Sequence, residues 1–143
     1  MSAQPNSAQA RQPRGFSQSI SSEEVAERAL SEALVRLCRG SWQGLARELA
    51  WRAVTGGGRD PRMVEYLSDS AERMLATLID EALWEVERTA ICAWEEHLAD
   101  HSGDRKGALA VAKLDAGEEA ERLVAAAYDR VLDTLLARSR RAA

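Results

Sequence analysis

The chain has 143 residues and a formal net charge of −4, with 45% hydrophobic and 29% charged residues. This length suits one domain with one core, and no apolar stretch is long enough to cross a membrane. The acidic balance argues against direct, tight binding to nucleic acid, which needs clustered lysine and arginine. We therefore expect a small globular protein whose partners are neither nucleic acid nor membrane.

Residues 1–20 are rich in Ser, Gln, Ala and Pro and contain no acidic residue, which predicts a disordered N-terminal tail. This composition is also weakly similar to a mitochondrial presequence. Ser21 and Glu24 have the spacing of a capping box, so a helical domain is expected over residues 21–143. Gly40 and Ser41 are expected to interrupt the first helix.

A second helical segment follows from Trp42, and three glycines at 56–58 are expected to end it. The third helix has the clearest start, because Asp60 can cap it and Pro61 fits its first turn. No proline or glycine interrupts this helix before Gly103. A helix of about 40 residues would be roughly 60 Å long, whereas a compact domain of this size is about 35 Å across. We therefore expect it to bend, to break near residues 88–90, or to overhang its domain.

Residues 102–114 contain two glycines and several charges, which predicts a loop. Asp115 and Glu118 repeat the capping-box spacing and are expected to open the last helix. No segment alternates with a period of two, so no strand is expected. The predicted fold class is all-α, with a long central helix flanked by shorter helices.

The central helix is apolar on two faces, which predicts that it is covered on two sides. Its middle carries Met74, Leu75, Leu78, Ile79 and Ala82. A second stripe, roughly opposite the first on a helical projection, carries Trp84, Ile91, Trp94 and Leu98. We expect a partner protein to cover the second stripe, with the last helix folded back over it as the alternative. The candidate partner-binding residues are Met74, Leu75, Leu78, Ile79, Ala82, Trp84, Ile91 and Trp94.

The order of short helix, Asp-Pro-Arg at 60–62, long helix, charged loop and short helix resembles a histone fold. More specifically, residues 60–88 resemble the histone-fold subunit TBP-associated factor ten, shared by transcription factor IID and the SAGA coactivator. The resemblance is carried by residues 60–64, 67–68, 71–75 and 79–83, with residues 30–37 upstream and 104–106 and 114–115 downstream. It covers about residues 28–135.

This resemblance implies a non-enzymatic scaffold subunit that forms a heterodimer with another histone-fold protein in a transcription coactivator complex in the nucleus. The alternative is a helical-bundle structural subunit of another large assembly, such as a mitochondrial or a cytoplasmic one. A third hypothesis is a small metal-dependent bundle enzyme, in which His97 would meet an acidic cluster in space. In the first two hypotheses no small-molecule substrate is expected.

His97 and His101 lie four residues apart, so one side of a helix would carry both imidazoles. Such a pair can hold zinc, but a zinc site needs further ligands, and no other His or Cys is close in sequence. A polar helix end is the expected role. Cys38 and Cys92 are expected to be reduced thiols in the core. The sequence therefore predicts no catalytic residues, no metal site and no cofactor.

Overall fold

The computed structural model describes residues 15–16, 20–38, 41–54 and 61–142. Within these residues the chain forms four helices, α2 (Ser22–Cys38), α3 (Trp42–Val54), α4 (Pro61–Asp100) and α5 (Arg105–Ala142). The described part contains no sheet, only one isolated bridge between Gly15 and Ser21. The all-α prediction is confirmed.

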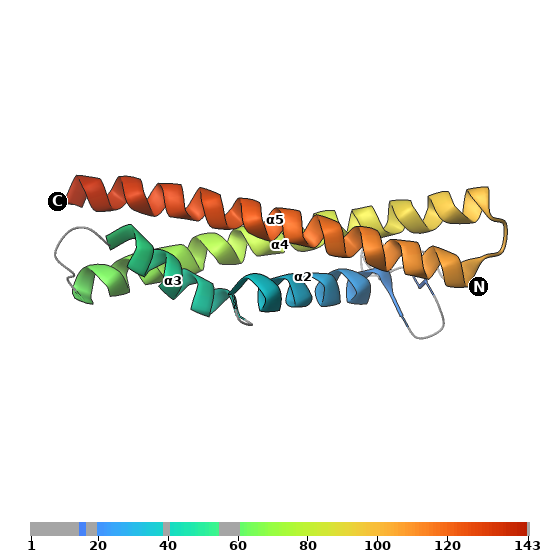
Figure 1. Cartoon of the computed structure of the whole chain (residues 1–143), viewed down its shortest axis with the longest axis horizontal. Helices are drawn as coiled ribbons and strands as arrows, with labels where there is room; N and C mark the ends of the chain where they lie inside the picture. Colours follow the sequence, from blue (N-terminus) through green and yellow to red (C-terminus); the bar gives the residue numbers. More distant parts are fainter. Residues whose placement is uncertain (1–14, 17–19, 39–40, 55–60, 143) are drawn as a thin grey trace, which may run out of the picture.

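The helices form an elongated bundle with three positions (Figure 1). The short helices α2 and α3 follow each other along one side, and together they occupy the first position. The chain then reverses into α4 and reverses again into α5, so α4 and α5 lie antiparallel along the whole bundle. Both α2 and α3 pack against both long helices.

Serine side chains cap the two short helices. The backbone N–H of Glu24 donates to Ser21 Oγ at 3.2 Å, as the capping-box spacing predicts. Gly44 N–H donates in the same way to Ser41 Oγ at 3.0 Å. Ser41, predicted only to interrupt the first helix, therefore caps the start of α3. The predicted cap at Asp60 and the glycines at 56–58 lie outside the described residues.

The central helix neither ends nor breaks near residues 88–90. It continues to Asp100 because its partner in the bundle, α5, is almost as long: α4 has 40 residues and α5 has 38. The premise of a compact domain was wrong, since each long helix supports the other along the bundle axis (Figure 1).

The prediction of a short last helix beginning at Asp115 is also wrong. The chain turns at Gly103, whose φ of +79° favours glycine, and α5 begins at Arg105. Asp104 caps it, because its Oδ1 accepts a hydrogen bond from the Gly107 N–H at 3.0 Å. Residues 105–114, predicted as a loop, are therefore the first turns of α5. Shorter helices were predicted on both sides of the central helix. They precede α4, but the helix that follows it, α5, is almost as long as α4.

The core runs along the bundle axis and is rich in alanine. The buried residues of α5 are Ala108, Ala112, Ala116, Ala120, Val124, Ala127, Val131 and Leu135. Most are four residues apart, so they form one stripe along the helix. Their small side chains let α2 and α4 approach α5 closely, and larger residues such as Leu45, Leu49, Leu67 and Leu75 fill the space near α3.

Candidate protein-interaction face

The eight residues predicted to bind a partner are distributed over three environments. Leu75, Ala82 and Trp94 are buried in the core of this chain, with 0%, 6% and 9% of their surface exposed. The half-buried residues, which pack against that core, are Met74, Leu78, Ile79 and Ile91. Trp84 alone among the eight is open to solvent, with 58% exposed. The first stripe therefore faces this chain's own helices.

The second stripe is divided between the core and the surface. Phe16 stacks on Trp94 with ring centroids 4.8 Å apart and an angle of 9° between the ring planes. Phe16 is only 2% exposed and its N–H donates to the carbonyl oxygen of Ile20 at 2.9 Å. Trp94 is therefore covered by the chain itself, and Phe16 contributes to that cover.

Phe16 lies inside residues 1–20, which were predicted to be a disordered tail. A single aromatic residue in a segment of Ser, Gln and Pro gives no periodic pattern, so sequence reasoning missed its role. One signal was present, because Phe16 is the only phenylalanine in the chain. The remainder of the predicted tail, apart from Gly15 and Ile20, lies outside the described residues.

Trp84 and Arg88 form the most distinctive feature of the outer face of α4. The Arg88 guanidinium carbon lies 4.9 Å from the centroid of the Trp84 ring, a cation–π arrangement. One face of the indole is thus held by a residue one turn along the helix, while much of the ring remains exposed. Tyr66 is 57% exposed and precedes Trp84 by five helical turns, so an ideal helix projects both rings from the same side.

A shallow groove lies between α4 and α5, on the side that α2 and α3 do not cover. Leu78 and Ala82 line it from α4, and Leu123 and Ala127 line it from α5. Its volume is about 170 Å³, too small for a drug-sized ligand. The groove shows that the middle of α4 presents some apolar surface beside its buried residues.

The two histidines lie at the end of α4, beside the corner with α5. Their ring centroids are 4.6 Å apart, and His97 Nε2 lies 2.9 Å from Asp104 Oδ2. This hydrogen bond is the largest cause that lowers the pKa of Asp104, and the Gly107 N–H contributes to the same shift. Because Asp104 caps α5, the contact ties the two long helices together. His97 thus meets a single carboxylate rather than the acidic cluster expected for a metal-dependent enzyme.

The thiols and metal-ligating groups add no further site. Cys92 is exposed rather than buried in the core, and it lines a separate polar hollow between α4 and α5 that also includes Glu96 and Glu119. The Cys38 side chain lies outside the described residues. Across the described ranges no three His, Cys, Asp or Glu side chains gather as metal ligands would.

Two buried serines connect distant parts of the chain, and sequence reasoning did not identify either. Ser22 is fully buried and donates a hydrogen bond of 2.7 Å to Glu87 Oε2. Ser70 accepts a hydrogen bond from Arg138, a residue of the C-terminal turns of α5. No periodic pattern marks a lone serine for such a role, because its partner is more than 60 residues away in each case.

Comparisons with family models, with curated proteins and with solved structures found no match to this chain. Among the described residues, no helix combines the length and the apolar character needed to span a membrane.

Proposed function

We propose that this protein is a non-enzymatic subunit that binds partner proteins through the outer face of α4. The observation that carries the proposal is the exposure of Trp84, held in place by Arg88. Tryptophan and arginine are enriched among the residues that contribute most to binding at protein interfaces. An exposed indole whose rotamer is already held by a neighbour loses little entropy when a partner covers it.

The bundle itself supports a scaffold rather than a flexible adaptor. Two antiparallel helices of 40 and 38 residues form a rod, and a 40-residue helix spans roughly 60 Å. A rod presents separated contact points, and Tyr66 and Trp84 are about 27 Å apart along an ideal helix. Of the scaffold hypotheses, we therefore favour a helical-bundle structural subunit of a large assembly.

Pairing through a histone fold in a nuclear coactivator complex is the second candidate, and the sequence resemblance over residues 60–83 supports it. A histone-type pair requires the middle of α4 to contact the partner. Leu75 and Ala82 are buried in the core of this chain, so a histone-type pair would have to replace their contacts within that core by contacts with the partner. The favoured alternative needs no such exchange, since Trp84 is already exposed.

The test is purification of the tagged full-length protein and of three variants, Trp84→Ala, Leu114→Ala and Leu75→Ala, from the native cell, followed by identification of stoichiometric partners. Trp84→Ala removes the exposed indole of α4, and Leu114→Ala removes an exposed apolar side chain of α5 as the matched control. We expect the first variant to lose a partner that the wild type and the control retain. Retention of every partner by Trp84→Ala would overturn the proposal. Loss only on Leu75→Ala, in a variant that stays folded, would instead favour the histone-type pair.

A further inference from the structure

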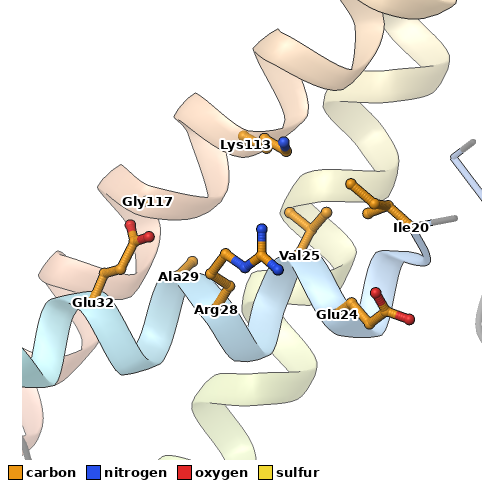
Figure 2. Close-up of a pocket in the computed structure, with 8 residues that line it drawn as sticks. All are labelled: Ile20, Glu24, Val25, Arg28, Ala29, Glu32, Lys113 and Gly117. Atoms are coloured by element: carbon orange, nitrogen blue, oxygen red, sulfur yellow. The ribbon is translucent and has the colours of Figure 1, made fainter.

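A second groove lies between α2 and α5, away from Trp84. Its apolar lining consists of Ile20, Val25 and Ala29, and it has a volume of about 210 Å³. Figure 2 shows α2 crossing beside α5, with Val25 and Ala29 between the two helices. Val25 and Ala29 are themselves buried, so the groove opens directly over the core.

Two cations reach this groove from opposite helices. Arg28 extends from α2 into the space between the helices, and Lys113 lies across from it on α5 (Figure 2). Within the described residues, neither side chain has a hydrogen bond or an ion pair. The nearest acids on α2 are Glu24, which points away from α5, and Glu32, which lies at the Gly117 end of the groove (Figure 2). An anion between Arg28 and Lys113 would meet both cations, and the apolar lining at Ile20 and Val25 would receive its apolar part.

Gly117 gives the groove its depth. Glycine in a helix interior destabilises the helix relative to alanine, so its presence calls for a reason. The usual reasons do not apply: a Cβ built at Gly117 would meet no atom within 4 Å, and Gly117 does not share the positive φ of Gly103. The missing side chain therefore serves neither a tight turn nor close helix packing. Its effect is to leave open the space beside Ala29.

We propose that this groove binds a small amphipathic carboxylate, with its carboxylate group between Arg28 and Lys113 and its hydrocarbon part on Val25 and Ile20. Charge complementarity selects the anionic group, and the buried floor selects an apolar body. Ile20 and Arg28 are eight residues apart and most of that segment is α2, so the groove offers roughly 12 Å along the helix axis. That length suits a medium-chain fatty acid such as octanoate. The site is independent of the α4 face and of the function proposed for it.

The experiment is a titration of the isotope-labelled full-length protein with sodium octanoate, followed by NMR, with neutral octanol as the comparison probe. We expect saturable shifts at the Gly117 amide and at the Val25 and Ala29 methyl groups, and weaker binding of octanol. The double variant Arg28→Gln/Lys113→Gln should lose about tenfold or more in affinity, the size of one charge-assisted hydrogen bond. Lys106→Gln, which removes an exposed cation of α5 outside the groove, should bind as the wild type does.

Gly117→Leu tests the space itself, because a Cβ there meets no atom within 4 Å and the longer side chain would occupy the groove. We expect it to abolish octanoate binding while the helical circular dichroism is retained. Equal affinities for octanoate and octanol, or undiminished octanoate binding by the double variant, would overturn the proposal. Non-saturable shifts spread over the surface would also overturn it. So would a groove that binds a partner protein and does not bind octanoate.

Discussion

His97 on α4 and Asp104 at the start of α5 are joined by a hydrogen bond of 2.9 Å between Nε2 and Oδ2. The other oxygen of the same carboxylate accepts the Gly107 N–H at 3.0 Å. One side chain therefore caps α5 and connects it to the last turns of α4. The corner between the two long helices depends on this residue, since Gly103 only supplies the change in chain direction.

The charge of Asp104 should stabilise the fold in a pH-dependent manner. Its pKa is lowered in the folded protein, chiefly by the hydrogen bond from His97, below the ordinary value of 3.8. A lowered pKa contributes stability that is present above the unfolded-state value and is lost as the pH falls through the folded-state value. Asp104→Asn retains a capping oxygen but removes the charge. We expect its urea midpoint to lie below that of the wild type at neutral pH and to converge with it below about pH 4. A difference that does not change with pH would show that the charge is not responsible.

Removing the Phe16 ring should destabilise the bundle although this residue lies outside the helices. Phe16→Ala empties a buried position against Trp94, and such changes cost about 3–5 kcal/mol. Trp84→Ala is the control, because its ring is exposed and surface substitutions stay within about 0.5 kcal/mol. Urea unfolding followed by circular dichroism measures both variants. Similar free energies of unfolding for the two variants would mean that Phe16 does not pack as described.

Leu75 should stabilise the single chain rather than an assembly. It is fully buried among this chain's own helices, so Leu75→Ala should lower the free energy of unfolding by about 2–5 kcal/mol. For a core formed within one chain, the unfolding midpoint should not depend on protein concentration. Denaturation of the wild type and the variant over a wide concentration range gives both quantities. A midpoint that rises with concentration would place Leu75 in an interface between chains, as a histone-type pair requires.

Two glycines should respond to alanine in opposite directions. Gly103 has a φ of +79°, where a Cβ is unfavourable even though no atom lies near it, so Gly103→Ala should destabilise the protein by about 1–2 kcal/mol. Gly117 lies inside α5 with open space around it, so Gly117→Ala should stabilise the protein by about 0.5–1 kcal/mol. Thermal unfolding of the two variants separates these effects. Destabilisation by Gly117→Ala would contradict the open space at this position.

The sequence by itself determined the features that depend on neighbouring residues. Apolar periodicity predicted the helices and the absence of strands, and the Ser21–Glu24 spacing predicted where the first helix is capped. The sequence alone could not locate the start of α5. Asp104 and Asp115 are both residues that can cap a helix, and each precedes a segment compatible with a helix. Asp104 became the cap because the chain reverses at Gly103 and brings His97 beside it.

Only the tertiary structure decided which apolar face is covered, and by which residues. Leu75 and Trp84 belong to equally plausible stripes of one helix, yet one is fully buried and the other is 58% exposed. Periodicity reports that a face is apolar, but the identity of its cover depends on residues far away in the chain, as with Phe16 on Trp94. Contacts between distant residues also explain the length of the bundle. The 40-residue helix α4 is longer than a compact domain because the 38-residue helix α5 packs along it.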